Sequence, residues 1–565
     1  RNVQMNKQLV AASFFLLSAI GLKCTLGQEK KVNYNIVKAK NTRTKYKDDT
    51  KYIQSLINKA KPGDTVKVPK GVYNIHSVRL KSGVSIYSAG LFKQLPPDTT
   101  ENFSFSKQYS ESPMFYGDKV NNISLTFNAE VNREAIYLNN CKNVTVRDVK
   151  LKGDSTKLLS FAGIYLYACD DVNIVNAEIS YFGKERNDPV YYQRGTGIRA
   201  QTTHNLKIVN SNIHHNGENG LFFHCCTDIV IKNNYVHHNG MSGIQVAFGS
   251  MGIEKNYEIT HNILEANAAD AIDINNPDEK RLVDLQAVIQ ENVSKNNGWV
   301  KGQRTRDGSG IATLVGLRNV IVKNNKSEES NRPAVYVREC DAIDVLANDA
   351  DNVAEIVGNL GHIRLYKNTF PEVRLLASVK AKKLTLDSNY IRHLSFPNGI
   401  SVDSLVLFAN DLKGNINVNM DGRLIFKDNK ISSSSPKGAI TLWRVSEAVL
   451  SGNQIQTSHQ DALALYVDNK ANNVLIKENK IAASLTCIKD GGSQNLKIIG
   501  NTLASDLDSV YASTVISVNP KDLHLNNNIY YLGKEKTDHA IGLEGEGKVY
   551  MEGESFNLLS PDRNN

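Results

Sequence analysis

Three side chains have the types and spacing that proton-transfer chemistry would need: Arg199, His224 and Asp273. Arg199 carries a permanent cation that can pair with a carboxylate through two hydrogen bonds. The imidazole of His224 has an ordinary pKa near neutrality, which suits a general base. Asp273 supplies a carboxylate. Each lies in or directly after a segment that recurs along the chain: Gly197-Ile-Arg-Ala200, Gly220-Leu-Phe-Phe223 and Ala271-Ile-Asp-Ile274.

These recurring segments predict two columns of outward side chains. A small residue is followed by an inward apolar residue, and the side chains then alternate outward and inward, as in a β-strand. The first column would contain Tyr137, Tyr165, Arg199, Phe222, Gln245, Asp273, Ala312 and Tyr336. The second would contain Asn139, Tyr167, Gln201, His224, Ala247, Asn275, Leu314 and Arg338.

The composition of these columns predicts sugar binding. A face that needed only solubility would carry Lys, Glu, Thr and Ser. Aromatic rings instead stack on sugar faces, while amides and Arg bond hydroxyls and carboxylates. The candidate substrate-binding residues are Tyr165, Tyr167, Tyr192, Gln201, Gln245, Asn275, Tyr336 and Arg338.

The candidate catalytic residues suit β-elimination from a uronate. Arg199 would neutralise the carboxylate, His224 would remove the C5 proton, and Tyr165, Tyr167 or Tyr192 would protonate the leaving oxygen. Epimerisation at C5 begins with the same proton abstraction, so the sequence does not separate these two reactions.

Two further classes of protein remain open. An inverting hydrolase needs two carboxyl groups about 6.5–9.5 Å apart. Asp273 together with Asp307, Asp188 or Glu218 would supply them. The other class is a glycan-binding solenoid without catalytic activity.

A repeat is what brings the recurring segments together. An apolar residue followed three positions later by Asn recurs from Ile231/Asn234 to Leu525/Asn528, at steps of 19 to 33 residues. A unit this short cannot bury its own apolar face, so the units must stack. We predict an all-β chain that forms a single-stranded right-handed parallel β-helix of about 15 coils. The recurring Asn is expected to adopt the left-handed conformation at a corner, and to bond the Asn of neighbouring coils.

Coil length indicates where the site lies. Coils between residues 144 and 325 are longer than those between 325 and 429, and extra residues must leave the solenoid as loops. The predicted loops are Ser180–Thr196, Asn275–Leu285 and Asn297–Ser309. We therefore place the site over residues 135–340 and interpret the later coils mainly as scaffold.

The N-terminal part is predicted to contain a signal peptide and a cap. Residues 5–27 combine Lys7, an apolar stretch and small residues, as in a secretory signal peptide, which predicts a secreted or periplasmic protein. A lipid anchor at Cys24 is the alternative. Asp49–Ala60 places Ile53, Leu56 and Ile57 on one helical face, so residues 28–75 are predicted to carry a capping helix. The β-helix itself is expected over residues 76–555.

Two other sets of residues recur in register. Cys141, Cys169, Cys226 and Cys340 occupy one position in four coils, which indicates buried thiols, with disulfides or a metal site as alternatives. His-His-Asn-Gly occurs at Ile213–Gly217 and Val236–Gly240, which indicates structural stacking, with a catalytic or metal-binding role as the alternative.

The N-terminal motif carries a family resemblance. Ile53-Gln54, followed by Ala60-Lys-Pro-Gly-Asp-Thr-Val66 and Pro69-Lys-Gly71, and then by stacked coils, resembles the pectin-lyase-like superfamily over residues 45 to 550. This resemblance implies the β-helix fold. Members include pectate and alginate lyases, mannuronan C5-epimerases, glycoside hydrolases, and spikes and adhesins without catalytic activity.

Two segments show looser likenesses within that superfamily. Asp270–Arg281 is similar in location to the signature segment of alginate epimerases, with Asn275 and Asn276 departing from that motif. Asn296–Ile311 resembles a segment of one pectate-lyase family, but Ala312 stands where that family has its catalytic Lys. No cofactor is expected; calcium held by Asp270, Asp273 and Asp278 is the alternative.

Composition limits the partners. The 565 residues carry a net charge of +9, and without the three positive charges of residues 1–27 the remainder carries +6, which suits an acidic polysaccharide. No Lys/Arg-rich run with interleaved aromatics occurs, so nucleic acid is not an expected partner. No run of eighteen apolar residues follows residue 27, so no membrane span is expected. We expect a monomer.

Overall fold

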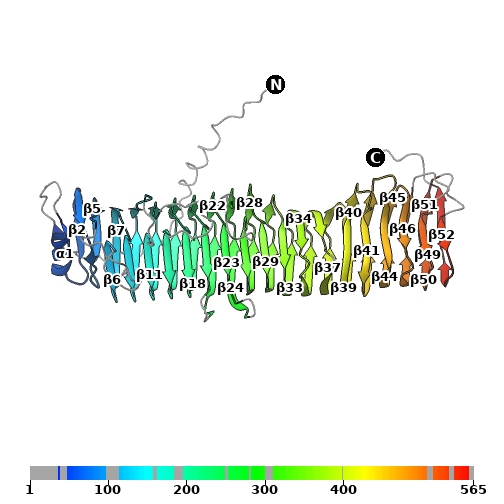
Figure 1. Cartoon of the computed structure of the whole chain (residues 1–565), viewed down its shortest axis with the longest axis horizontal. Coiled ribbons are helices and arrows are strands. Elements are labelled where there is room, and N and C mark those ends of the chain that lie inside the picture. The colour runs from blue at the N-terminus through cyan, green and yellow to red at the C-terminus, as the bar shows by residue number, and fades with distance from the viewer. Residues whose placement is uncertain are drawn as a thin grey trace, which may run out of the picture.

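The computed structural model is one elongated solenoid (Figure 1). It describes residues 36–38, 48–96, 113–156, 162–183, 195–248, 252–278, 281–298, 309–397, 399–505, 513–533 and 540–558. Successive coils advance along the long axis from the blue N-terminal end to the red C-terminal end. All the strand pairings between coils are parallel, as in β14 (Ile198–Gln201) with β17 (Leu221–His224). The predicted all-β parallel β-helix is therefore confirmed.

Three strands form each coil in the N-terminal half. In one example, β14 is followed by β15 (His204–Val209) and β16 (Asn212–His214), and these pair with β17, β18 (Thr227–Lys232) and β19 (Tyr235–His237) of the next coil. We call the three resulting sheets the lead, second and third sheets. The lead sheet also contains β6 (Phe115–Asp118), β8 (Ile136–Asn139), β11 (Ile164–Tyr167), β20 (Ile244–Ala247), β23 (Ile272–Asn275), β26 (Ala312–Val315), β29 (Val335–Arg338) and β32 (Ala354–Val357).

The coil number is about 18 rather than the predicted 15. The difference arises because the first coils lack the repeated Asn. In these coils β2 (Thr65–Val68) and β3 (Val72–Ile75) already pair with β5 (Ser85–Gln94), which in turn pairs with β7 (Asn121–Glu130). Parallel pairing therefore begins before residue 76, where the sequence predicted the start of the solenoid.

A ladder of buried Asn side chains joins the coils at the corner between the second and third sheets. At Asn389, Nδ2 donates to Leu365 O at 2.9 Å and to Asn410 Oδ1 at 3.0 Å, and Oδ1 accepts from both nitrogens of Asn368. The same bonds recur from Asn234 to Asn528. This confirms the predicted bonding between neighbouring coils.

The expected backbone conformation of the ladder Asn was wrong. The left-handed φ belongs to the residue before it, as at Ser388 (φ 57°) before Asn389 and Asp428 (φ 55°) before Asn429. The corner thus turns one residue early, which sends the Asn side chain inward, where it is 1% exposed. This geometry explains why the ladder Asn bonds along the axis instead of facing water.

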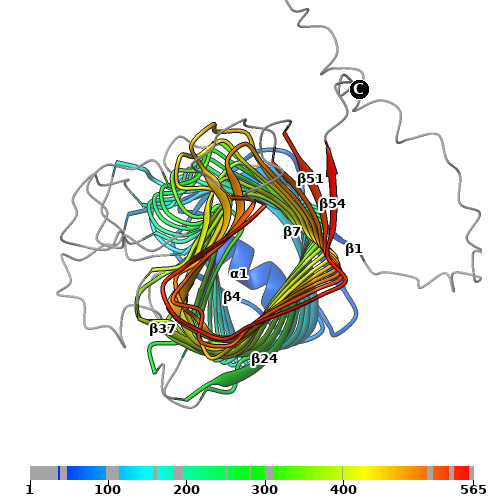
Figure 2. The same ribbon diagram turned by 90° about the vertical axis from the view of Figure 1, so that its right-hand side faces the viewer.

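Helix α1 (Thr50–Lys59) caps the N-terminal end, as predicted. Its Ile53, Leu56 and Ile57 are buried against the first coil, because they share one face of the helix. Figure 2, which looks along the solenoid, shows α1 lying across the bore at the far end. No helix in the described part of the chain is long and apolar enough to cross a membrane.

The later coils have a different strand pattern. From residue 369 onward, one continuous strand takes the place of a third-sheet strand and the lead strand that follows it. For example, β34 (Thr369–Leu375) pairs with both β31 (Asp349–Ala350) and β32. We call residues 113–338 the front coils and residues 359–477 the rear coils. Lead-strand pairing stops after β36 (Tyr390–Ser395) and resumes between β39 (Ile416–Lys427) and β41 (Ile440–Val445).

Candidate functional site

The lead sheet of the front coils presents the outward columns that the sequence predicts, and we call this surface the front face. Residues Tyr165, Arg199, Phe222, Gln245 and Asp273 follow one another in register across β11, β14, β17, β20 and β23. Adjacent strands in a sheet lie about 4.8 Å apart, so this column is about 19 Å long. It forms a straight strip parallel to the solenoid axis.

One coil of these columns was misaligned in the sequence analysis. Asp273 pairs with Thr313 and Asn275 with Val315, so Thr313 and Val315 take the outward places predicted for Ala312 and Leu314. Ala312 and Leu314 belong to the inner core with no exposed surface, while Thr313 and Val315 are only 2% exposed because their outward side is covered too. Side chains alternate with a period of two, and a slip of one residue therefore exchanges the inner and outer faces.

Three stacked tyrosines begin the front face. The rings of Tyr116 and Tyr137 lie 5.6 Å apart, and those of Tyr137 and Tyr165 lie 5.2 Å apart, both in stacked geometry. The hydroxyl of Tyr165 donates to Gln201 Oε1 at 2.9 Å. Tyr165 is only 4% exposed, whereas Tyr167 is 39% exposed. Of these two predicted binding residues, Tyr167 is therefore the one open to a ligand.

Arg199 is held in place by two neighbours. Its Nη2 donates to Glu218 Oε2 at 3.1 Å, and its guanidinium lies 4.5 Å from the ring centroid of Phe222. Thr196 Oγ1 donates to the same carboxylate oxygen at 2.6 Å. The Arg199 side chain nonetheless keeps 28% of its surface exposed, against 12% for that of Glu218. Glu218 therefore positions the cation while leaving part of the guanidinium open.

A chain of amides continues the network toward Asp273. Asn219 Nδ2 donates to Gln245 Oε1 at 2.8 Å, and Gln245 Nε2 donates to Asp273 Oδ2 at 3.0 Å. Asp273 lies three coils from Arg199 and is 8% exposed. The structure thus brings Arg199 close to His224, but it does not bring Asp273 to the same point.

His224 is oriented by a single hydrogen bond. Its Nδ1 lies 2.9 Å from the carbonyl oxygen of Ala247. A carbonyl only accepts, so Nδ1 carries the proton and Nε2 of the neutral ring keeps its lone pair. Gln201 pairs with His224, two residues after Arg199. The Cα atoms of Arg199 and His224 are therefore about 8 Å apart, given a coil spacing of about 4.8 Å and a rise of about 3.3 Å per residue.

Glu134 is a buried carboxyl group that the sequence analysis missed. It is 1% exposed, and among the described residues neither of its carboxyl oxygens makes a hydrogen bond of normal geometry. Burial raises its pKa well above the usual value, although the Ala162 backbone and Arg199 oppose this shift. Burial and the nearby Glu134 also raise the pKa of Tyr137. Burial therefore favours the protonated form of Glu134, although the nearby Arg199 cation opposes this.

The remaining predicted residues lie along the same sheet. Tyr336 is 7% exposed, and Asn275 and Arg338 are partly exposed at the ends of β23 and β29. Tyr192 lies outside the described residues, as do Asp188 and Asp307. Asp270 is buried at 5% exposure and accepts from the backbone N–H of Ser309 and, at 3.0 Å, from Thr313 Oγ1.

No described group of three or more His, Cys, Asp or Glu residues has the arrangement of a metal site. Asp270 fastens the start of β26, while Asp273 bonds Gln245. Two of the three carboxylates of the calcium alternative are thus engaged in different contacts, and a calcium role stays a prediction. The described cysteines are buried and form no disulfide with one another: Cys141, Cys169, Cys225, Cys226, Cys340 and Cys487.

The His-His-Asn-Gly repeats form stacks on the third sheet. His214 stacks on His237 with ring centroids 4.8 Å apart, and His215 stacks on His238 at 4.9 Å. Burial and the neighbouring imidazoles lower the pKa of His237 to about 3. The Asn residues of the two repeats are the first two members of a second, shorter Asn ladder, which the sequence analysis missed. Its members are Asn216, Asn239, Asn267 and Asn297.

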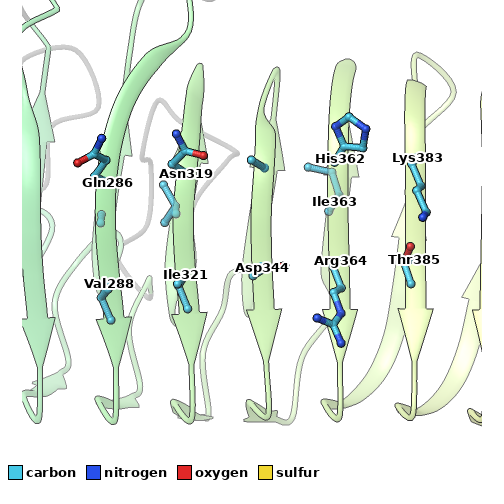
Figure 3. Close-up of a pocket in the computed structure, with 13 residues that line it drawn as sticks. Gln286, Val288, Asn319, Ile321, Asp344, His362, Ile363, Arg364, Lys383 and Thr385 are labelled. Carbon is cyan, nitrogen blue, oxygen red and sulfur yellow. The ribbon is translucent and has the colours of Figure 1, made fainter.

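A groove also runs along the second sheet, as Figure 3 shows. It encloses about 640 Å³ and is lined from five successive strands: β24 (Val283–Gln290), β27 (Leu317–Lys323), β30 (Asp341–Leu346), β33 (Asn359–Tyr366) and β35 (Lys380–Asp387). His362 pairs with Asp341 at 3.2 Å and Arg364 with Asp387 at 3.6 Å. We place the candidate site on the front face instead, because Arg199 and His224 lie there on adjacent strands, near the exposed ring of Tyr167.

Comparisons with known proteins agree with this architecture. Residues 116–284 match the family model described as right handed beta helix region. No curated protein matches the sequence. The solved structures that it resembles include the Streptococcus pneumoniae surface protein and adhesin PfbA, with 16% identity, a TM-score of 0.43 and coverage of 64% of this chain and 96% of that one.

Two other solved structures are similar over most of the chain. The Azotobacter vinelandii mannuronan C-5 epimerase AlgE6 A-module has 12% identity and a TM-score of 0.35, with 91% of this chain and 96% of that one covered. The pre-mature bacteriophage phi29 gene product 12 has 12% identity and a TM-score of 0.46, with 90% and 72% covered. At these identities the likenesses concern the fold alone. The family match over residues 116–284 and the parallel stacking of the coils together show that the chain forms a right-handed parallel β-helix.

Proposed function

We propose that the protein is a secreted carbohydrate-active enzyme, and that its front face cleaves an acidic, uronate-containing polysaccharide by β-elimination. The observation that carries the proposal is the pairing of a positioned cation with a positioned base. Arg199 is held by Glu218, and His224 lies one coil further along with its Nε2 lone pair free of the Ala247 hydrogen bond. Such a pair is what abstraction of a proton beside a carboxylate requires.

Each step of the reaction has a candidate group. The exposed part of the Arg199 guanidinium binds the uronate carboxylate and so makes the C5 proton more acidic. Nε2 of His224 removes that proton, and the electron pair forms the C4–C5 double bond as the C4–O bond breaks. The phenol of Tyr167, in the coil before Arg199, donates its proton to the departing oxygen. The Tyr116–Tyr137–Tyr165 stack forms one wall of the strip.

Hydrolysis is the second candidate function, because two carboxyl groups lie near Arg199 in different environments. Burial raises the pKa of Glu134 well above its usual value, which favours its protonated form. Glu218 instead accepts hydrogen bonds from Arg199 and Thr196. An acid of raised pKa and an ionised base are the pair that an inverting glycosidase uses. C5-epimerisation shares the first step of the lyase and differs only in how the proton returns.

The experiment is incubation of the purified protein with alginate, polygalacturonate, chondroitin and a neutral glucan. The proposal expects new reducing ends together with the ultraviolet absorbance of an unsaturated uronate. Reducing ends without that absorbance would replace the lyase by a hydrolase, and no turnover of any glycan would contradict both. We expect a chelator to leave the rate unchanged, whereas a rate restored only by Ca²⁺ would support the calcium alternative.

A further inference from the structure

The rear coils contain a polar cavity beside an exposed Trp. The cavity encloses about 670 Å³ and is lined by Asn417, Asn419, Trp443, Arg444, Asp468 and Lys470, among others. These residues come from β39, β41 and β44 (Leu463–Lys477), which continue the lead position of the coil. The sequence analysis had interpreted these coils as scaffold, since they carry none of the long loops.

Trp443 is exposed because the strands bulge at this point. Val418 pairs with Leu442, but Asn419 pairs with Arg444, so Trp443 has no opposite residue in β39. On its other side, Leu442 pairs with Val467 and Arg444 with Lys470, which leaves Asp468 and Asn469 opposite Trp443. Bulges break the ladder and re-aim side chains, and they are over-represented beside binding sites. The irregularity in consecutive coils gives the cavity its shape.

The ring and the polar groups around it suit a sugar. Trp443 is 42% exposed and contacts Tyr466 edge-on, with ring centroids 5.6 Å apart, so one ring face stays available. Asp468 is held by Tyr466, whose hydroxyl donates to Oδ2 at 3.3 Å. Arg444 pairs with Asp421 at 3.2 Å. An aromatic ring face beside a positioned carboxylate and the exposed amide of Asn417 matches the apolar face and the hydroxyl rim of a pyranose.

We infer that the Trp443 cavity is a second glycan-binding site, in which a pyranose unit stacks on Trp443 while Asp468 and Asn417 bond its hydroxyls. The site lies nine coils beyond His224, counted from β17 through β20, β23, β26, β29, β32, β34, β36 and β39 to β41. At about 4.8 Å per coil the two sites are about 43 Å apart along the axis. The cavity would thus hold a polymer at a distance from the front face, and it is independent of the chemistry proposed there.

Trp fluorescence provides a direct test, because Trp443 shares the chain with only one other Trp, Trp299. The Trp299→Phe variant makes Trp443 the sole reporter, and added Arg199→Ala and His224→Ala substitutions prevent turnover. The probes are hexasaccharides of alginate, polygalacturonate, chondroitin and cellulose. We expect at least one probe to change the Trp443 emission saturably. An unchanged emission with all four probes would overturn the inference.

Calorimetric titration with the same probes supplies the matched comparison. Trp443→Ala should weaken binding about tenfold, since loss of one aromatic contact costs about 1.4 kcal/mol. Phe408→Ala removes another exposed aromatic, on β37 (Ile400–Phe408) of the second sheet, and should change nothing. Equal affinity of Trp443→Ala and the parent protein would overturn the inference. Binding that depends on Trp443, together with no turnover of any glycan by the wild-type protein, would contradict only the proposed function.

Discussion

The front and rear coils share one scaffold, but they differ in what their outward lead-strand side chains do. In the front coils these side chains bond one another across coils, as in Arg199 with Glu218 and Gln245 with Asp273. In the rear coils the lead-strand cation Arg444 forms an exposed ion pair with Asp421 at 3.2 Å. A buried network fixes side-chain positions, whereas exposed pairs leave them mobile and screened by solvent.

The difference teaches that the scaffold and the site are encoded separately. The Asn ladder begins at Asn234 within the front coils and continues through the rear coils, with the same bonds at Asn262 and at Asn389. Coil stacking therefore does not distinguish them. The long loops of the front coils and the bulges around Trp443 are where the repeat is interrupted, and those are the places where candidate sites occur.

The largest expected effect separates the two regions by activity. Arg199→Ala and His224→Ala should each lower turnover of the uronate glycan by about 100-fold or more, because each removes a group that acts in the transition state. The matched variants Arg364→Ala and His362→Ala, on the second sheet, should leave turnover unchanged. Rates are measured from the unsaturated product. Equal losses in both pairs would remove the functional distinction between the two surfaces.

Substitution of a ladder Asn should lower the unfolding free energy by the same amount in either region. Asn262→Ala or Asn389→Ala removes buried bonds to both neighbouring coils and leaves their partners unpaired, which we expect to cost about 2–4 kcal/mol of unfolding free energy. Urea unfolding measures this loss, with Asn128→Ala at an exposed strand position as the control. A cost confined to one region would contradict a common scaffold.

Acid should destabilise the front coils selectively. The pKa of His237 in the folded protein is about 3, against 6.5 for the free side chain. Between pH 3 and 6.5 the imidazole is therefore protonated in the unfolded chain but not in the folded one. Stability therefore falls as the pH is lowered from about 6.5 toward 3. His237→Gln should flatten that slope, while His393→Gln, at an exposed site in the rear coils, should not. Thermal unfolding midpoints between pH 4 and 7 measure this pH dependence. Equal slopes for wild type and His237→Gln would contradict the assignment of the effect to His237.

Glu134 should show the opposite pH dependence. Its folded pKa lies well above the usual value, so the folded state binds the extra proton and wild-type stability falls as the pH rises above about 4.5. Glu134→Gln removes this penalty and should be more stable than wild type at pH 8, with little difference at pH 4.5. Glu552→Gln, at an exposed residue, is the control. A Glu134→Gln variant that is less stable than wild type at pH 8 would mean that the carboxylate form is favoured.

The smallest effect is expected from the rear-coil ion pairs. The Arg423 and Glu447 side chains are 52% and 46% exposed, and such a pair contributes about 0.2–1 kcal/mol. A double-mutant cycle with Arg423→Ala and Glu447→Ala should give a coupling energy at the low end of that range, and less in high salt. A coupling energy above about 2 kcal/mol would mean that these exposed pairs contribute as much to stability as a buried network does.

Most outward residues of the front face could be predicted from the alternation of side chains. The carboxyl groups at its corners and the burial of each side chain could not. Arg199 and His224 were identified because they fall at outward positions of an aligned repeat. Glu134 was missed and Glu218 was named only as a candidate hydrolase carboxyl group, because both lie in corners between strands, where no alternation indicates which way a side chain points. Tyr165 was predicted as a binding residue from its column, yet neighbouring coils bury it.

Sequence alone determined the fold, because a repeat of about twenty residues with alternating apolar positions and a recurrent Asn can bury its apolar face only by stacking. It also determined α1, since the periodicity of that helix is local. Only the tertiary structure decided the register at Thr313, the left-handed residue before each ladder Asn, and the bulge that exposes Trp443. These features depend on how each coil meets its neighbour, and a single coil does not contain that information.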